Sequence, residues 1–292
     1  MTAMGVVGVG RIGAALLTRL AAAGHHVIAT DIRPERRGVV EKSGAEWARD
    51  AVTVAGGSQL LFTVLPGIPE LREFALGPAL SALGDDAVWI DMTSASVELG
   101  EECARRHGSR YLDAPIGGGV QAMRAGTVTL YVGGDPDVLR ASTPVLRSFA
   151  GKIHHVGGSG KGYLTKLLIN LLWFGHATLT TEVLLLAQRH GQRPDRMREL
   201  LLGSAGDSAY VGQHLPALLD GDYLRDFGLD RCVEELDSVE RSADRAGVPH
   251  PLTSAVAELH RTALRHFGPV DGELMATAWL EEQAGIELRG EG

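Results

Sequence analysis

The segment spanning residues 4–31 constrains the fold of this chain more than any other stretch. An apolar run is followed by the spacing Gly8-x-Gly10-x-x-Gly13 and then by a helix-forming stretch. Such a turn brings the backbone close to a pyrophosphate at the helix N-terminus and lets helix and strand pack closely. A second apolar run ends in Asp31, 21 residues after Gly10, where a carboxylate can accept hydrogen bonds from the adenosine ribose hydroxyls. The segment therefore predicts a dinucleotide-binding strand–helix–strand unit.

The same turn predicts which dinucleotide is bound. Arg11 and Ile12 lie between the second and third glycines and complete the expected cofactor-binding loop. The carboxylate of Asp31 repels a 2′-phosphate, so we expect NAD to be preferred. Three arginines follow within six residues, and one of them could reach a 2′-phosphate, although we favour the interpretation that they form a solvated helix face. NADP therefore stays open as the alternative cofactor.

Two further apolar runs, 59–66 and 87–94, read as buried parallel strands. Ligands of open parallel sheets bind beyond the carboxyl ends of the strands. We therefore expect Leu65, Pro66 and Ser94 to line the cofactor, with Ser94 also close to the substrate. Pro66 could instead simply terminate its strand.

The composition excludes several classes of function. The formal net charge of −8 argues against binding to nucleic acid or to an anionic membrane, and the longest apolar run is too short to predict a membrane span. Two cysteines are too few for a disulfide framework or a zinc site, so we expect no metal. The chain starts with a strand-forming segment rather than a leader, and we expect a cytoplasmic protein.

Three successive glycines, Gly117, Gly118 and Gly119, follow an apolar run that starts at Tyr111 and that we expect to be a strand. Glycines are costly to order, so three of them are a poor choice for a plain connection. Their exposed amides could bind a substrate carboxylate. A tight crossing of two backbone segments would explain them as well.

The longest helix-forming segment runs from Gly160 to about His190 and contains no proline. Lys166 and Asn170 lie four residues apart in it and therefore share one helix face. The surrounding side chains are apolar, which predicts a buried helix. Lys166 could extend its ammonium group to the surface, or it could exchange a proton with a substrate oxygen.

The rest of the chain reads as helices, which we expect at 197–202, 214–219, 229–245, 251–265 and 272–284. The pattern predicts a dinucleotide-binding domain over residues 1–158 and an all-helical domain for substrate binding and dimerisation over residues 159–292. Apolar helices around one central helix leave surface to cover, so we expect a homodimer.

Taken together, these segments resemble the β-hydroxyacid dehydrogenase family, within the 6-phosphogluconate dehydrogenase superfamily. The resemblance rests on Gly8–Gly13, on Asp113–Gly119 and on Gly160–Asn170. Shorter matches occur at Leu65-Pro66 and at Asp91–Ser94, and the resemblance covers essentially the whole chain.

The resemblance implies an α/β protein with a doubly wound N-terminal Rossmann sheet, a long interdomain helix and an all-α C-terminal domain. It implies an NAD(P)-dependent oxidoreductase acting on the CH–OH group of a small 3-hydroxyacid, with Lys166 as catalytic acid and base and Asn170 positioning the substrate. Gly117–Gly119 would bind that substrate. The alternatives are an imine or keto reductase acting on a bulkier non-carboxylate substrate, and a catalytically inactive dinucleotide-binding protein.

Three residues depart from the family pattern. Gly117 replaces a serine whose hydroxyl would contact the substrate carboxylate, and Ile169 replaces the first of two asparagines. Glu234 stands where the family has a lysine, which would put a negative charge in place of a positive one unless Glu234 faces solvent. The departures leave the identity of the substrate open.

Overall fold

The computed structural model describes residues 3–290 and divides into two compact units. The first unit contains the residues up to Lys166, and the second contains those from Leu167 onward. The division falls inside helix α9, Lys161–Arg189, whereas the sequence places the boundary just before this helix, between residues 158 and 159. Lys166 therefore packs with the N-terminal unit.

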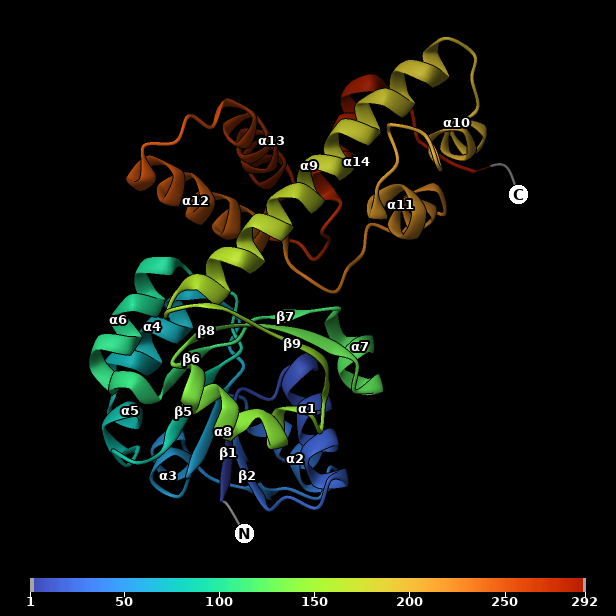
Figure 1. Ribbon diagram of the computed structural model, residues 1–292. Helices are drawn as coiled ribbons and strands as arrows, with labels where there is room; N and C mark the ends of the chain where they lie inside the picture. Colours follow the sequence, from blue (N-terminus) through green and yellow to red (C-terminus); the bar gives the residue numbers. More distant parts are fainter. Residues whose placement is uncertain (1–2, 291–292) are drawn as a thin grey trace. The chain divides into compact units, whose positions relative to one another are not determined.

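Within residues 3–290, nine strands form one sheet in the first unit (Figure 1). The strands are β1 Met4–Val7, β2 Val27–Thr30, β3 Glu46–Trp47, β4 Leu60–Thr63, β5 Val88–Asp91, β6 Tyr111–Asp113, β7 Ile116–Gly117, β8 Val128–Gly134 and β9 Ala150–Gly157. The order is β3-β2-β1-β4-β5-β6-β8-β7, with β9 paired to β8, and β1 to β6 are parallel. This is the doubly wound Rossmann order, so the predicted fold class is confirmed.

Helices cover both faces of this sheet because alternate strand residues point to opposite faces. Phe62 and Ile90 belong to one buried cluster with Leu16 of the first helix, whereas their neighbours Leu61 and Trp89 belong to a second cluster. The helices of this unit are α1 Arg11–Ala22, α2 Arg37–Lys42, α3 Ala51–Gly56, α4 Ile68–Leu76, α5 Pro78–Ala82, α6 Val97–His107, α7 Gly119–Ala125 and α8 Pro136–Leu146.

The strand expected to run from Tyr111 into the three glycines is confirmed over β6, but it does not continue into the glycines. The chain breaks after β6, and β7 pairs antiparallel with β8. Gly118 then adopts φ +102° and starts α7. A break is expected at this point because Pro115 has no amide to donate to a ladder. The cluster is therefore a strand-to-helix turn.

The second unit is helical, as predicted. After the rest of α9 it contains α10 Pro194–Leu201, a π-helical turn Tyr210–His214, α11 Leu215–Leu219, α12 Leu229–Ala246, α13 Pro251–Phe267 and α14 Met275–Ala284. The last helix begins three residues later than expected because Gly272, at φ +150°, lies in an extended connection next to the bridge between Gly228 and Asp271.

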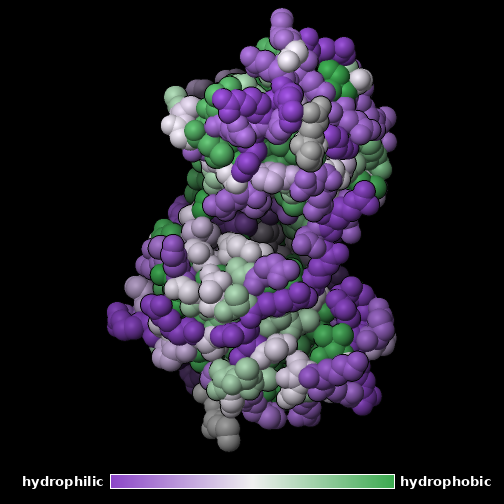
Figure 2. All heavy atoms as spheres, turned by 90° about the vertical axis from the view of Figure 1, so that its right-hand side faces the viewer, coloured by the Kyte–Doolittle hydropathy of each residue, from purple (hydrophilic) through white to green (hydrophobic). Residues whose placement is uncertain are grey.

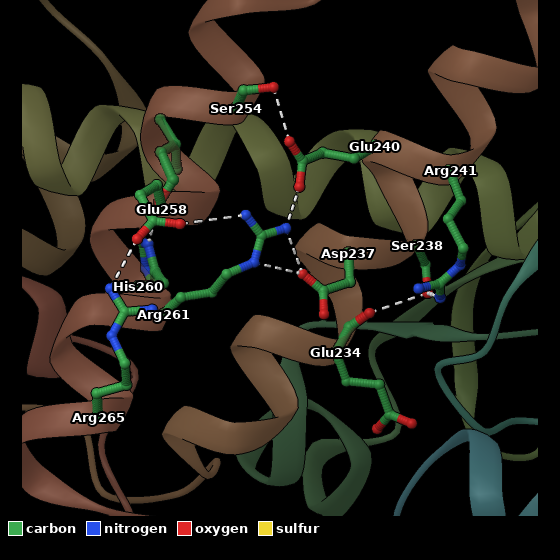
Figure 3. Close-up of polar contacts among 11 residues, drawn as sticks. Glu234, Asp237, Ser238, Glu240, Arg241, Ser254, Glu258, His260, Arg261 and Arg265 are labelled. Atoms are coloured by element: carbon green, nitrogen blue, oxygen red, sulfur yellow. Dashed lines mark hydrogen bonds and ion pairs between the residues drawn. The ribbon is translucent and has the colours of Figure 1, made fainter.

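An ion-pair network joins α12 to α13 (Figure 3). The guanidinium of Arg261 on α13 donates to Asp237 Oδ1, with Nε at 3.0 Å, and to Glu240 of α12. Ser254 Oγ donates to the other oxygen of Glu240 at 2.7 Å. Because these charges are only partly exposed, the network fixes how the two helices pack.

Helix α9 uses one face for the core of its own unit and exposes another. Phe174 and Leu184 are buried, whereas Leu172, Leu179 and Leu186 are 61%, 63% and 63% exposed. By length and composition α9 could cross a membrane, a test that core helices of soluble proteins also pass. The face of the molecule drawn in Figure 2 is mostly hydrophilic, with hydrophobic residues in small separate groups. A row of exposed leucines on one helix is therefore a distinct feature of the surface.

Candidate active site

The glycine turn after β1 has the geometry that a dinucleotide needs. Gly8 adopts φ +96°, and a Cβ there would lie 2.2 Å from Val64 O. A Cβ on Gly13 would lie 2.0 Å from Gly8 O, so only glycine lets α1 pack this closely against the turn. A Cβ on Gly10 would meet nothing within 4 Å. The turn is therefore crowded toward the protein and open at the start of the helix.

The start of α1 fits a pyrophosphate. Gly10 is its N-cap and supplies no side-chain hydrogen bond, so the first backbone amides of the helix are not capped by it. Arg11 is exposed and Ile12 is half-buried in this first turn. Backbone amides and the helix dipole favour an anion there.

Asp31 lies directly beside this turn. Its Oδ2 accepts a hydrogen bond from Val9 N at 2.7 Å, and its Oδ1 accepts one from Arg33 Nε at 2.9 Å. Burial pushes the pKa of Asp31 up, but the hydrogen bonds from Arg33 and Val9 outweigh it and hold the pKa below its ordinary value. Asp31 is therefore an ionised acceptor fixed where the ribose of a dinucleotide is expected.

The ends of β4 and β5 are tied together next to that turn. Leu65 N donates to Thr93 Oγ1 at 3.1 Å, and Thr93 Oγ1 donates to Asp91 Oδ1 at 2.8 Å. Pro66 is exposed and Ser94 is half-buried. The structure thus brings the segments of Leu65, Pro66 and Ser94 to the same edge of the sheet.

Asp91 is buried and accepts hydrogen bonds from several side chains. Hydroxyl groups of Thr63, Thr93 and Tyr163 donate to its carboxylate. Because Tyr163 donates its only hydroxyl proton to Asp91, Tyr111 Oη must be the donor in its 2.6 Å contact with Tyr163 Oη. Burial raises the pKa of Asp91 to about 6 against the effect of these hydrogen bonds.

Asp113, the register partner of Asp91 on β6, holds the first turn of α9. Its Oδ1 accepts from Gly160 N at 2.7 Å and its Oδ2 from Tyr163 N at 3.1 Å. Burial raises the pKa of Asp113 to about 7, opposed by these backbone hydrogen bonds. A Cβ on Gly162 would lie 2.6 Å from Asp113, so only glycine allows this close approach. The start of α9 is therefore fixed to the carboxyl ends of two sheet strands.

The two residues expected to act on the substrate lie along α9. Lys166 is half-buried and follows the anchored turn directly. Asn170, one helical turn further, donates from Nδ2 to Glu235 Oε2 at 2.6 Å, and Glu235 is only 5% exposed. This bond turns the amide oxygen of Asn170 away from Glu235. Asn170 is thus held in one orientation by a residue of α12.

The charge of Glu234 is compensated locally. Arg231, one turn earlier on α12, donates from Nη1 to Glu234 Oε2 at 3.0 Å. The side chain of Glu234 is 24% exposed. Arg231 Nε also lies 3.6 Å from Asp230 Oδ2, so one guanidinium faces two carboxylates and compensates the charge of Glu234 only in part.

The glycine cluster presents its backbone to solvent. Gly118 and Gly119 are exposed and adopt φ +102° and +64°, and Gly117 is half-buried on β7. The positive φ values explain the second and third glycines, because other residues are strained in that region. They do not explain Gly117.

Among residues 3–290 no group of three or more His, Cys, Asp or Glu side chains could hold a metal ion. Cys103 and Cys232 are both free and buried. Burial raises the pKa of the Cys103 thiol to about 12, which makes it a poor nucleophile.

Several residues of this site do not follow from residue-by-residue reading of the sequence. Asp91, Asp113 and Tyr163 anchor α9, and Glu235 orients Asn170. The sequence does contain a signal for the two aspartates, because each stands at the end of an apolar run and parallel strands bring such ends together at one edge of the sheet. No comparable signal identifies Glu235.

Comparison with known proteins places this geometry in a family. Residues 3–157 match the NAD binding domain of 6-phosphogluconate dehydrogenase, and residues 160–279 match the NAD-binding family of NADP-dependent 3-hydroxyisobutyrate dehydrogenase. The chain is similar to 2-(hydroxymethyl)glutarate dehydrogenase from Eubacterium barkeri, with 29% identity over 98% of this chain and 97% of that protein.

Solved structures agree with this assignment. The Mycobacterium tuberculosis 3-hydroxyisobutyrate dehydrogenase with L-serine has a TM-score of 0.85 at 25% identity, covering 96% of this chain and 99% of that one. An imine reductase from Myxococcus stipitatus has a TM-score of 0.64 at 18% identity, covering 96% and 99%, and shows a shared fold only. The comparisons thus favour the dehydrogenase interpretation over imine reduction. The chain belongs to the β-hydroxyacid dehydrogenase family and is an NAD(P)-dependent oxidoreductase of the 3-hydroxyacid dehydrogenase type, acting on CH–OH groups.

Proposed function

We propose that this enzyme interconverts a 2-substituted 3-hydroxypropanoate and its semialdehyde, with Lys166 as the proton-transfer residue. The observation that carries the proposal is the anchoring of α9. Asp113 holds the first turn of this helix at the carboxyl end of the sheet, the edge where Rossmann proteins bind the dinucleotide. Lys166 follows that turn directly, which favours a role next to the cofactor.

The chemistry divides into a hydride and a proton. The bound nicotinamide supplies or accepts the hydride. In oxidation, neutral Lys166 takes the hydroxyl proton as the alcohol carbon loses its hydride, and the product is an aldehyde. In reduction, the ammonium form of Lys166 returns the proton to the developing alkoxide. Asn170, which is oriented by its bond to Glu235, positions the substrate.

The substrate class follows from what two relatives act on. The names 2-(hydroxymethyl)glutarate and 3-hydroxyisobutyrate both describe a primary alcohol, CH2OH, attached to the carbon that also bears a carboxylate. The ion pair of Glu234 with Arg231, which also contacts Asp230, reduces the effect of the Glu234 charge on an anionic substrate. We assign the carboxylate to the backbone amides of Gly117–Gly119, with Ser94 close to the substrate.

NAD is the proposed cofactor, held by Gly8, Gly10, Arg11, Ile12, Gly13, Asp31, Leu65, Pro66 and Ser94. The ionised carboxylate of Asp31 supports this preference because it would repel a 2′-phosphate. The guanidinium of Arg33 is the group that could reverse it, since it could turn from Asp31 toward such a phosphate.

Reduced-cofactor formation tests the reaction directly. NAD and NADP are each supplied with 3-hydroxyisobutyrate, with 2-(hydroxymethyl)glutarate and with bulkier alcohols that lack a carboxylate, and the semialdehydes and a cyclic imine are tested in reduction. We expect turnover of the 3-hydroxyacids with NAD. Turnover of the cyclic imine alone, or tight NADH binding without any turnover, would contradict the proposal.

A homodimer is proposed as the assembly. Leu172, Leu179, Val183 and Leu186 follow one another at helical spacing and are all exposed, by 37% for Val183 and by 61–63% for the leucines. The opposite face of α9 packs on its own unit, which favours a protein partner over lipid. A second copy presents the same stripe, as a two-fold interface requires. Light scattering should give a dimer for the wild type and a monomer for Leu179→Lys; a wild-type monomer would contradict this proposal.

The cytoplasm is the proposed location. Both cysteines are free thiols, which suits a reducing compartment. Fractionation of the native host should find the protein in the soluble cytoplasmic fraction, and recovery in a membrane or periplasmic fraction would contradict this location.

A further inference from the structure

Tyr131 lies close to the space that a side chain at position 117 would fill. A Cβ on Gly117 would lie 3.3 Å from Tyr131 Cε2 and 3.4 Å from Tyr131 Oη. β7 and β8 pair antiparallel with Gly117 opposite Thr129. Residue 117 therefore faces the same side of the sheet as Thr129 and Tyr131, which are two apart on β8. The phenol hydroxyl of Tyr131 therefore lies close to the position that the side chain of a serine at position 117 would occupy.

The backbone of Tyr131 also lies against the helix that carries Lys166. A Cβ on Gly162 would lie 2.4 Å from Tyr131 O. Gly162 and Lys166 are four residues apart on α9, so they share a face with Cβ positions about 5–6 Å apart. All three residues belong to the first unit. The backbone of Tyr131 thus lies beside a residue one helical turn before the proposed proton-transfer residue, and Gly117 lies beside the ring of Tyr131.

The ring of Tyr131 is held by packing. It is half-buried and stacks on His154 of β9, with ring centroids 6.1 Å apart and an interplanar angle of 16°. The hydroxyl groups of Tyr111 and Tyr163 are engaged in the network around Asp91. Tyr131 instead is half-buried, and its hydroxyl lies beside Gly117 of β7.

We propose that Tyr131 donates the hydrogen bond to the substrate carboxylate that the family's loop serine would donate from position 117. This inference rests on the proposed function, because it assumes a substrate with a carboxylate. A phenol and a serine hydroxyl both offer one O–H donor to a carboxylate oxygen. The loss of a side chain at Gly117 is then compensated from the neighbouring strand, and Gly117 is small because a larger residue would crowd the Tyr131 ring.

The test compares Tyr131→Phe with Thr129→Val, a matched control that removes a different hydroxyl from the same face of β8. Turnover of 3-hydroxyisobutyrate and of its neutral methyl ester is measured, together with the Kd of 3-hydroxyisobutyrate for the NADH-loaded enzyme. We expect Tyr131→Phe to raise KM and Kd for the acid about 10- to 100-fold, with kcat changed less than about 3-fold. The methyl ester should be affected far less, and Thr129→Val should behave as the wild type.

A rescue variant makes the assignment specific. Gly117 does not have a positive φ, and Tyr131→Ala removes the ring that would crowd a side chain at this position. Gly117→Ser in the Tyr131→Ala background should therefore recover most of the affinity for the acid that Tyr131→Ala alone loses. A Tyr131→Phe variant with wild-type KM and Kd, or a Thr129→Val variant with the larger loss, would overturn the inference while leaving the proposed function intact. A wild type that neither turns over nor binds any 3-hydroxyacid would overturn both.

Discussion

The carboxylate of Asp113 accepts a hydrogen bond from the backbone amide of Tyr163 at 3.1 Å, three residues before Lys166. The other oxygen of the same carboxylate accepts from Gly160 N at 2.7 Å. A residue at the end of a buried strand thus fixes the start of the helix that carries the proposed proton-transfer residue. We infer that this cap sets the position of Lys166 relative to the sheet.

Replacing Asp113 with asparagine should weaken that cap, because only one side-chain atom can then accept a hydrogen bond. We expect the free energy of unfolding to fall by about 1–3 kcal/mol, together with a lower kcat. Asp50→Asn is the control: Asp50 caps the surface helix α3 through Thr53 N at 2.8 Å, and asparagine caps about as well as aspartate. Chemical denaturation and steady-state kinetics measure both effects. An unchanged kcat in a folded Asp113→Asn variant would show that the cap does not position Lys166.

The pairing of Asp31 with Arg33 predicts a change in cofactor preference. In Asp31→Ser the repulsion of a 2′-phosphate is lost and Arg33 loses its partner, so we expect weaker NADH binding by about 10-fold and tighter NADPH binding. Glu35→Gln alters a nearby exposed charge and should leave both affinities unchanged. Fluorescence titration gives the two Kd values. The interpretation of Asp31 is wrong if the variant keeps the wild-type ratio of NADH to NADPH affinity.

Glu235 should act through Asn170. Asn170→Ala is expected to lower kcat/KM by about 10- to 100-fold, which is the effect of losing one hydrogen bond to the reacting substrate. Glu235→Leu should also lower kcat/KM, because it removes the acceptor for Asn170 Nδ2. Glu235→Gln keeps an acceptor and should retain most activity. Glu234→Gln, at the neighbouring paired residue, is the control. Equal activity of the Leu and Gln variants at position 235 would contradict the orienting role.

His260, which is 1% exposed and packs against Phe174 with the two rings tilted at 56°, should contribute to the pH dependence of stability. Burial lowers the pKa of His260 from 6.5 to about 4 in the folded chain. Between these values the unfolded chain binds a proton at this histidine that the folded chain does not, so the contribution of His260 to the free energy of unfolding decreases as pH falls from 6.5 toward 4. This contribution approaches a loss of about 3 kcal/mol at the lower end. The raised pKa values of Asp91 and Asp113 act in the opposite direction over the same range.

Urea denaturation between pH 7 and pH 4 measures this dependence. The free energy of unfolding of His260→Leu relative to the wild type should rise as pH falls, because the variant lacks the contribution of His260, whereas His26→Gln, at an exposed histidine, should keep the wild-type pH dependence. A wild-type slope in the His260→Leu variant would assign the effect to other groups.

The sequence predicted the features that repeat a regular pattern. The glycine spacing after β1, the apolar runs of the parallel strands and the proline-free run of α9 each follow from local rules of turns, strands and helices. The same rules failed between Tyr111 and Gly119, where the chain folds back on β8 after Pro115, because pairing with a strand further along the chain decides the outcome.

Contacts between distant segments account for what the sequence did not predict. Glu235 is 65 residues from Asn170, and Tyr163 is 72 residues from Asp91. Nothing in the spacing of such residues marks them as partners, since their proximity follows only from how the strands and helices are assembled. Tyr131 and Gly117 meet for the same reason, through the antiparallel pairing of β7 and β8.

The most direct test of the account is the turnover of Lys166→Ala and Lys166→Arg with NAD and 3-hydroxyisobutyrate, read together with the Kd of NADH. Alanine cannot transfer a proton, and arginine stays charged at all accessible pH values, so we expect both variants to lose kcat by about 10²- to 10⁴-fold. The Kd of NADH should stay within about 3-fold of the wild type, because the groups that we assign to dinucleotide binding lie elsewhere on the sheet. A Lys166→Ala variant that binds NADH and turns over at the wild-type rate would contradict the central role of this lysine.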